Sequence, residues 1–310
     1  MKYFIMLLSL LIFLICIGID MMSRLVTQNK QVKSLNSVNF VTLTNNGYLD
    51  YTLNCLKSLE LIDFQKPLHC YAIDQECHNI LQLKGYNSTC LKLTNVSSKF
   101  EIWDSKNIPK IYFQKFTIIY KNLLENKFVC FTDGDIVFLD KKFMNYCLDY
   151  IQDNDMVIQN DSLSNNDHTN LCSGFMFIKS NKKTIDLFNP KNVEEDVKDK
   201  WGDQIHVNKI KSKLKYRTLP LHLFPNGRYY YQSKNPLHFV NLIFNCKPMM
   251  IHFNWVIGHE KRNKMKKYNK WYLRMVDILK SEIKLIEWQR INKDLNDIIV
   301  QNSPTDESDS

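Results

Sequence analysis

The sequence predicts an α/β fold, a single Rossmann-like domain with a mostly parallel central sheet. Short apolar runs typical of buried strands alternate with segments of helical periodicity, and the first three lie at residues 38–44, 48–61 and 68–73. Strand, helix and strand in this order form a parallel βαβ unit, in which ligands bind at the carboxyl ends of the strands. The 310 residues, of which 45% are hydrophobic, suffice for the core of one large domain or two small ones.

The chain divides into four predicted segments: a signal-anchor at residues 1–19, a stem at residues 20–37, the α/β domain at residues 38–299 and a disordered acidic tail at residues 300–310. The anchor is an apolar run interrupted by Ser9 and Gly18, at the short end of what crosses a membrane. Because no small-residue cleavage site follows it, we expect an uncleaved transmembrane helix rather than a secreted form. The expected topology is single-pass type II, with the domain in an ER- or Golgi-like lumen.

Sequons and cysteines are compatible with that compartment. Asn87, Asn95 and Asn160 each begin an Asn-X-Ser/Thr sequon, although such triplets also arise by chance in an Asn-rich chain. Of the nine cysteines, Cys16 lies in the predicted anchor and eight lie beyond it. An even number suits disulfides, whose pairing the sequence does not give, and Cys130 is expected to be a buried thiol in a core strand.

The net charge of +9 does not indicate a nucleic-acid partner. Alanine is nearly absent, whereas Lys, Asn, Ile, Phe and Tyr abound, which is typical of a codon-composition bias. A nucleic-acid binder would concentrate its charge in a stripe with aromatic residues. The nearest candidate, residues 261–270, is better explained as a solvated helix face.

Two early features are candidate ligand contacts. The loop after the first strand, with Thr42 and Thr44, is placed to contact a nucleotide base, and an ordinary turn explains it equally well. Pro109 suits the first turn of a helix whose apolar stripe predicts core packing. Lys115 lies off that stripe, where it either reaches a phosphate or is simply solvated.

The helix after Pro109 leads directly into the stretch around which the chain is organised, FVCFTDGDIVFLD at residues 128–140. Asp133 and Asp135 offer hard oxygen ligands to one divalent cation, and Gly134 between them leaves room for a bulky ligand. The competing interpretation is a β-hairpin with Asp133 and Gly134 as its turn. A helix feeding a buried strand is typical of a crossover connection and favours the metal–diphosphate site.

The elements that follow are a helix at residues 142–151, strands at 156–159 and 173–178, a helix beginning at 201–204, a strand at 249–253, a loop at 254–258 and helical periodicity over 270–300. Gly174 opens its strand as a position of close approach. Asp203 is able to cap the N-terminus of its helix.

Four signatures stand in one order: FTDGDIVFL, CSGFMFIKS, WGDQ and HFNWVIGHEKRNKMKKYNKWY. In residues 39–272 the chain therefore resembles the nucleotide-diphospho-sugar transferase family, retaining glycosyltransferases of the GT-A type related to plant and protist arabinosyl-, xylosyl- and galactosyltransferases. The resemblance implies a GT-A domain. Gly134 departs from the family pattern, which often has a larger apolar residue there.

The resemblance assigns roles to residues at both ends of the domain. Asp133 and Asp135 match the motif that holds Mn²⁺ (or Mg²⁺) and the diphosphate of a nucleoside-diphosphate sugar. His252 matches a further metal ligand, with a satisfied structural histidine as the alternative and His259 as the competing candidate. Gly258 and Lys261 match positions at which a lysine meets the diphosphate.

The implied activity is a metal-dependent retaining glycosyl transfer from a nucleoside-diphosphate sugar to a glycan, glycoprotein or other hydroxyl acceptor. The leaving group needs its negative charge neutralised, and no protonating acid is required. Asp203 and Gln204, with Asp161 behind them, are the candidates to stabilise the reacting sugar; for Asp203 the helix cap is an equal alternative. The alternative function is a catalytically inactive GT-A-like binding protein, which the intact Asp133, Asp135, His252 and Lys261 disfavour.

Overall fold

The computed structural model describes residues 35–93, 95–101, 105–198, 202–232 and 247–274. Its strands are β1 (Val38–Thr44), β2 (His69–Ala72), β3 (Ser88–Cys90), β4 (Phe128–Thr132), β5 (Ile136–Phe138), β6 (Met156–Asn160), β7 (Leu171–Lys179), β8 (Tyr216–Leu219) and β9 (Met250–His252). Seven of them form one sheet in the order β3-β2-β1-β4-β7-β6-β8. All strands of this sheet run in one direction except β7, which is antiparallel to both of its neighbours. The predicted α/β fold with a mostly parallel sheet is confirmed.

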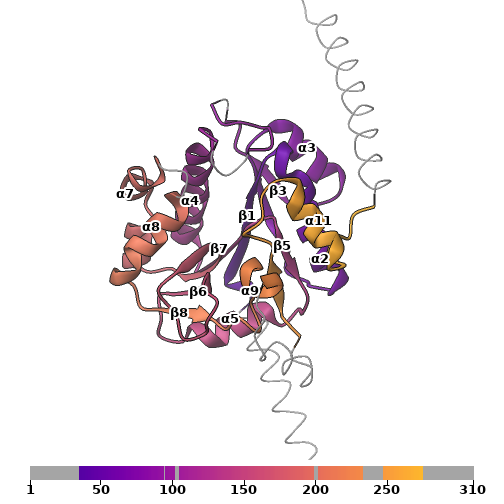
Figure 1. Cartoon of the computed structure of the whole chain (residues 1–310). Coiled ribbons are helices and arrows are strands. Elements are labelled where there is room, and N and C mark those ends of the chain that lie inside the picture. Colours follow the sequence, from indigo (N-terminus) through magenta and orange to yellow (C-terminus); the bar gives the residue numbers. More distant parts are fainter. Residues whose placement is uncertain (1–34, 94, 102–104, 199–201, 233–246, 275–310) are drawn as a thin grey trace, which may run out of the picture.

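Helices cover both faces of this sheet (Figure 1). They are α2 (Leu49–Leu61), α3 (Gln75–Leu83), α4 (Ile108–Glu125), α5 (Phe143–Ile151), α6 (Lys182–Leu187), α7 (Pro190–Val193), α8 (Gly202–Ile210), α9 (Gly227–Gln232) and α11 (His259–Lys267), with 3-10 turns η1 (Asn46–Tyr48), η2 (Asp196–Lys198) and η3 (Lys211–Lys213). One core joins the sheet to α2, α3 and α5, and a second joins it to α4, α6, α7 and α8.

Strand β4 shows how the sequence produces these two cores. Its five residues are all buried, and successive side chains point to opposite faces. Phe128 and Cys130 belong to the core under α2, whereas Val129 and Phe131 belong to the core under α4. A continuous apolar run is therefore required, as expected for a central strand buried on both sides.

The hairpin interpretation of the Asp-Gly turn is wrong. β4 pairs with β1 and β7, while β5 leaves the main sheet and pairs only with β9 among the described residues. Ser58 of α2 accepts a 3.0 Å hydrogen bond from the backbone N–H of Phe138, which attaches β5 to that helix. The turn therefore connects two separate sheets, and its two acids lie where a ligand can reach them.

Several segments differ from the expectation or lie outside the described residues. The last predicted strand lies outside the main sheet and forms the small β5–β9 sheet, and α3 and β3 were not predicted. Residues 270–274 are not helical, and the rest of the helix expected over 270–300 is not described. The predicted anchor and acidic tail are also not described. No helix within the described residues is long and apolar enough to span a membrane.

The sequons and cysteines are now placed. Asn87 and Asn95 are exposed, whereas Asn160 is fully buried and its side chain donates to the carbonyls of Ser164 and Asp167. Attachment of a glycan at Asn160 would therefore require the fold to open. None of the cysteines in the described part of the chain forms a disulfide, and Cys130 is a buried thiol as expected.

We predict that Asp155 stabilises the fold in a pH-dependent manner. Its nearly buried carboxylate accepts from Lys215 N–H, Asn181 Nδ2 and Lys183 Nζ, each at 2.9 Å, which fixes β6 against β8 and α6. Burial opposes ionisation, but these donors outweigh it and lower the pKa of Asp155. Because the folded pKa is below the unfolded value of about 3.9, the stabilisation is complete above that value and is lost as the pH falls through the folded pKa.

Asp155→Asn should therefore lower the free energy of unfolding by about 1–3 kcal/mol at pH 7, and the difference from wild type should shrink below about pH 4. Urea unfolding at a series of pH values measures both. Asp153→Asn, at an exposed position two residues away, is the matched control. A deficit for Asp155→Asn that stays constant down to pH 3 would refute the assignment.

Candidate active site

A cavity of about 280 Å³ lies at the carboxyl ends of β1 and β4. Strand β7 runs the other way, so its N-terminal part, which includes Ser173 and Gly174, reaches the same edge of the sheet. Side chains from α4, α8, β9 and α11 complete the wall. The cavity thus lies where ligands bind in open α/β sheets.

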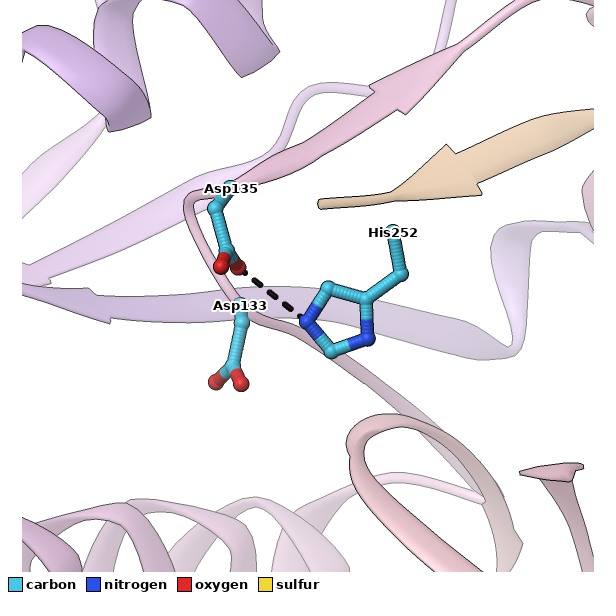
Figure 2. A group of neighbouring side chains, drawn as sticks. All are labelled: Asp133, Asp135 and His252. Carbon is cyan, nitrogen blue, oxygen red and sulfur yellow. Dashed lines mark ion pairs between the residues drawn. The ribbon is translucent and has the colours of Figure 1, made fainter. Parts of the chain in front are cut away.

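Asp133, Asp135 and His252 meet at one end of this cavity (Figure 2). Each offers one ligand atom, and the three atoms lie within 4.8 Å of one another. The register that places Ile136 opposite His252 brings this histidine, from far along the chain, beside the acidic turn. The tertiary fold thereby unites the acids and the histidine that the sequence predicted as metal ligands.

The tautomer of His252 suits a metal ligand. Gln159 donates its amide N–H groups to the carbonyls of Phe224 and Pro225, so its Oε1 is the atom that faces His252 Nδ1, at 2.7 Å. Nδ1 must therefore carry the proton and donate it to Gln159. The opposite atom, Nε2, lies 3.2 Å from Asp135 Oδ1. The lone pairs of Nε2 and of the Asp135 oxygen repel at this distance unless a proton or a cation lies between them. A hydrogen bond from Nδ1–H to an oxygen is the usual support of a metal-binding histidine.

Two buried lysines neutralise the acids. Lys115 Nζ lies 3.0 Å from Asp133 Oδ1 and 2.8 Å from Asp203 Oδ2. Lys261 pairs with Asp135, and its Nζ donates to Tyr48 Oη at 2.6 Å. Burial lowers the pKa of each lysine, but the paired aspartates outweigh it and raise the pKa above its ordinary value. Both lysines are therefore charged, and the alternative of a solvated Lys115 is wrong.

The two metal-motif acids have different environments. Burial raises the pKa of Asp133; Lys115 opposes this rise and the charge of Asp135 adds to it. Burial also opposes ionisation of Asp135, but Lys261 and His252 outweigh it and hold its pKa well below its usual range. Asp133 is the more accessible, with a side chain 32% exposed. It is therefore the acid whose negative charge would gain most from a second cation.

Two glycines are required by close packing rather than by a ligand. A Cβ on Gly174 would lie 2.2 Å from Cε1 of His252 and 2.8 Å from Oδ2 of Asp133, which confirms the predicted close approach. A Cβ on Gly134 would lie 2.5 Å from Oγ1 of Thr52 in α2. The expectation that Gly134 leaves room for a ligand is therefore corrected. Helix α2 occupies that space.

The three candidate catalytic residues are close together but have different environments. The Asp203 carboxylate accepts from Ser173 Oγ at 2.8 Å as well as from Lys115, so its Oδ2 is fully engaged. Gln204 lines the cavity and donates from Nε2 to Asp161 Oδ2 at 3.0 Å. Its Oε1 has no hydrogen-bond partner within the described part of the chain. Asp161 is buried behind the cavity wall and orients Gln204 rather than facing a substrate.

Aromatic side chains form part of the cavity wall beside Lys261. The rings of Tyr48 and Phe100 are stacked with centroids 5.5 Å apart and planes 5° from parallel. Ile111 and Tyr112 of α4 line the same region. The cavity wall thus combines the charged groups with flat aromatic rings, and Tyr48 contacts Lys261 directly.

The remaining predicted positions have separate outcomes. Thr44, at the end of β1, lines the cavity. Thr42 does not: it lies two residues deeper in the strand, fully buried, and its hydroxyl has no partner in the described residues. Gly258 lines the cavity and is the N-cap residue of α11. Its φ of 57° is a conformation that favours glycine. His259 is the first residue of α11, and its side chain is not among those that the structure describes; the metal-ligand cluster in the described residues contains His252.

Sequence reasoning missed Gln159 and Ser173, which orient His252 and Asp203. It included Tyr48 only in the loop at residues 42–48 that was expected to contact a base, whereas Tyr48 orients Lys261. No local pattern marks them, because each partner is distant in the chain. The nearest signal was that Tyr48 follows the Asn-Asn-Gly turn and Ser173 precedes the close-approach glycine.

Comparison with known proteins gives consistent matches. The family model described as nucleotide-diphospho-sugar transferase matches residues 65–267. The chain is 27% identical over 281 residues to the UDP-galactose:fucoside alpha-3-galactosyltransferase of Dictyostelium discoideum, in a match that covers 75% of this chain and 43% of that protein. This chain thus spans less than half the length of that relative.

Solved structures with a similar arrangement are more distant. The apo-form glycosyltransferase GlyE of Streptococcus pneumoniae TIGR4 aligns with a TM-score of 0.49 at 12% identity, covering 82% of this chain and 63% of that one. Mouse xyloside xylosyltransferase 1 aligns with a TM-score of 0.46 at 11% identity, covering 70% of this chain and 98% of that one.

We predict that Gly174→Ala disrupts the Asp133–His252 geometry. The added methyl group forces the His252 ring or β7 to move, at a cost of about 1–3 kcal/mol. The variant should lose the rise in Tm on addition of Mn²⁺ that a metal bound to the native fold would produce. Phe177→Leu, three residues along the same strand, should lower stability but keep the Mn²⁺ response. An unchanged Mn²⁺ response in Gly174→Ala would show that these ligands do not depend on the close approach.

Proposed function

Because the chain belongs to the nucleotide-diphospho-sugar transferase family, a family of glycosyltransferases, we propose that it transfers a sugar from a nucleoside-diphosphate sugar to a hydroxyl acceptor, with a divalent metal and retention of configuration. The assignment to the GT-A type is part of this proposal. The observation that carries it is the convergence of Asp133, Asp135 and His252 with Lys115 and Lys261 at the end of one cavity.

The charges of this end fit a metal–diphosphate. Three carboxylates, of Asp133, Asp135 and Asp203, face two ammonium groups, which leaves one negative charge uncompensated when all are ionised. Carboxylate oxygens with one imidazole suit Mn²⁺, and Mg²⁺ is the alternative. When bound, such a cation would neutralise charge on the diphosphate leaving group. Asp133, Asp135 and His252 would hold it.

The two lysines are then available to the donor. Each now neutralises an acid of the motif, Lys115 at Asp133 and Lys261 at Asp135. A cation on these acids would take over that role, while Lys115 retains Asp203 and Lys261 retains Tyr48. Both ammonium groups would remain as point charges for the phosphate oxygens, where they stabilise the charge that develops as the diphosphate departs.

The aromatic rings of the cavity wall would contact the nucleoside. Phe100 stacks on Tyr48 and remains 38% exposed, so a base has a ring surface on which to stack. Thr44, at the end of β1, also lines the cavity. The sugar of the donor would lie near α8, because Asp203 and Gln204 line the cavity there.

The pairing of the acids supports retention. Inversion needs a free carboxylate to deprotonate the acceptor, but among the described residues the aspartates that line the cavity are each paired with a lysine. The fourth acid among the described lining residues, Glu101, accepts from Ser105 and Asn107. In a retaining reaction the bond from the sugar carbon to the diphosphate oxygen breaks, the acceptor oxygen bonds to that carbon, and the acceptor proton passes to the diphosphate.

Gln204 is the residue best placed to stabilise the reacting sugar. Its Nε2 is held by Asp161 and by Asn170 Oδ1, at 3.0 and 3.3 Å, which leaves the carbonyl oxygen for the cavity. A carbonyl oxygen can stabilise positive charge as the sugar–diphosphate bond lengthens. Asp203 is less suited, because Lys115 and Ser173 already engage its carboxylate. It positions Lys115 instead.

The choice of donor to test follows the named relative, which uses UDP-galactose and a fucoside. We therefore take UDP-galactose as the first donor and a glycan or glycoprotein hydroxyl as the acceptor class. The anchor at residues 1–19 and the lumenal location also remain proposals. Retention of the full chain in membranes after a carbonate wash would support the anchor, and its release would refute it.

The proposed activity predicts that Asp133→Asn lowers turnover on the order of 10²-fold or more, because the variant cannot hold the charge-neutralising cation. The fold should persist, since Lys115 keeps Asp203 as its partner. The measurement is Mn²⁺-dependent release of nucleoside diphosphate from a panel of nucleotide sugars, with metal removal expected to mimic the variant. Asp140→Asn, outside the cavity on the same stretch, is the control.

If Asp133→Asn turned over the donor as fast as the wild type at every Mn²⁺ concentration, the metal assignment would be refuted. Donor binding without any release of nucleoside diphosphate by the wild type would favour the inactive binding protein instead.

Substitution of His252 and substitution of Lys261 should impair activity in different ways. His252→Ala removes one ligand and should chiefly raise the Mn²⁺ concentration needed for half-maximal activity. Lys261→Ala should instead reduce turnover at saturating Mn²⁺, since leaving-group stabilisation acts in the transition state. It should also lower stability, because Asp135 loses its buried partner. Titrating Mn²⁺ against initial rates separates the two, and identical metal responses in both variants would contradict these roles.

A further inference from the structure

Trp255 has three properties that packing alone does not explain. It lies in the loop after β9 with a backbone φ of 61°, a conformation that costs a bulky residue free energy. Its side chain is nevertheless 48% exposed, so burial of the ring does not offset that cost. The residues on either side, Asn254 and Val256, both line the cavity, whereas Trp255 itself lies outside the lining, at the rim.

The ring is held in place although it is exposed. Its Nε1 donates to Asp161 Oδ1 at 2.9 Å, and Asp161 is only 3% exposed. The Arg228 guanidinium of α9 lies 5.2 Å from the ring centroid. Asn254 donates to the same Asp161 oxygen at 3.0 Å and accepts from Gly227 N–H at 2.6 Å, which fixes the loop. The indole is thus oriented by the hydrogen bond from its Nε1 and by the Arg228 guanidinium near its ring. Part of the ring surface remains exposed.

The same buried carboxylate orients Gln204. Asp161 receives Trp255 on Oδ1 and Gln204 Nε2 on Oδ2, so the rim indole and the cavity amide are fixed relative to each other through a single side chain. A ligand lying against Trp255 would therefore be held next to the part of the cavity where the donor sugar is expected.

We propose that Trp255 is the stacking platform of an acceptor subsite, and that the acceptor is a pyranose sugar. This inference rests on the proposed function. A pyranose has one face of C–H groups that packs on an aromatic ring, and its hydroxyl groups remain at the edge for transfer. A rigid, exposed indole beside the reacting end of the cavity provides such a surface at little further loss of side-chain entropy.

The test uses the full chain with UDP-galactose as donor and methyl β-D-galactopyranoside or methyl α-L-fucopyranoside as acceptor, with glycerol as the acyclic comparison. Trp255→Gly removes the ring and suits the positive φ, so it should fold normally. Trp255→Phe keeps a ring but loses the hydrogen bond to Asp161. Leu124→Ala removes an exposed apolar side chain, 55% exposed, on the far end of α4 and is the control.

Trp255→Gly should raise KM for a pyranoside about tenfold or more, with KM for UDP-galactose nearly unchanged. Trp255→Phe should lie between this variant and wild type, and Leu124→Ala should match wild type. The rate of transfer to glycerol should be the same with and without the Trp255 ring. An unchanged pyranoside KM in Trp255→Gly overturns the proposal.

Binding measured without turnover separates this proposal from the proposed function. Saturation-transfer NMR on each pyranoside should show ring-proton signals with wild type that are lost with Trp255→Gly. If neither the wild type nor any variant releases nucleoside diphosphate, the transferase proposal fails. Loss of the ring-proton signals with Trp255→Gly would still support the stacking platform. Equal signals for both proteins, or none for wild type at millimolar pyranoside, overturn it.

Discussion

The site depends on the antiparallel pairing of β5 with β9. Strand β5 cannot pair with β4, because β1 and β7 occupy both edges of β4, and the Asp133–Asp135 turn redirects the chain. Pairing with β9 then sets Ile136 opposite His252, and the alternation of side chains decides which groups face the cavity. A one-residue slip would turn His252 away from Asp135. The register of a three-residue strand thus controls whether the two halves of the ligand set meet.

Buried charge is the second constraint. Carboxylates at the carboxyl end of a parallel sheet are costly to bury unless they are paired. Lys115 and Lys261 provide that pairing, one from α4 and one from α11, and the aromatic neighbours of Lys261 shield its pair with Asp135 from solvent. In the proposed complex the same lysines would be available to phosphate, because a cation would replace them at the acids. One set of charges therefore serves the stability of the fold and the chemistry that we propose.

Asp161 shows how a residue outside the cavity can organise two parts of a site. It holds Gln204 at the wall and Trp255 at the rim, and it is shielded from solvent while doing so. It contacts these two side chains rather than the cavity, so we propose for it a role in orientation. The positive φ of Trp255 belongs to the same arrangement, since the strain in the loop is offset by hydrogen bonds to Asp161 and Gly227.

The sequence alone determined the α/β class, the strand at Val38–Thr44, the paired acids of the turn and the close approach at Gly174, because each is written in local periodicity or in adjacent residues. Only the tertiary structure decided that β5 leaves the main sheet, that Thr42 is buried away from the cavity and that helix α2 requires Gly134. It also revealed the partners that orient the site, Gln159 for His252 and Tyr48 for Lys261, which are 93 and 213 residues apart in the chain. Such contacts arise from packing between distant elements, and a local pattern carries no information about them.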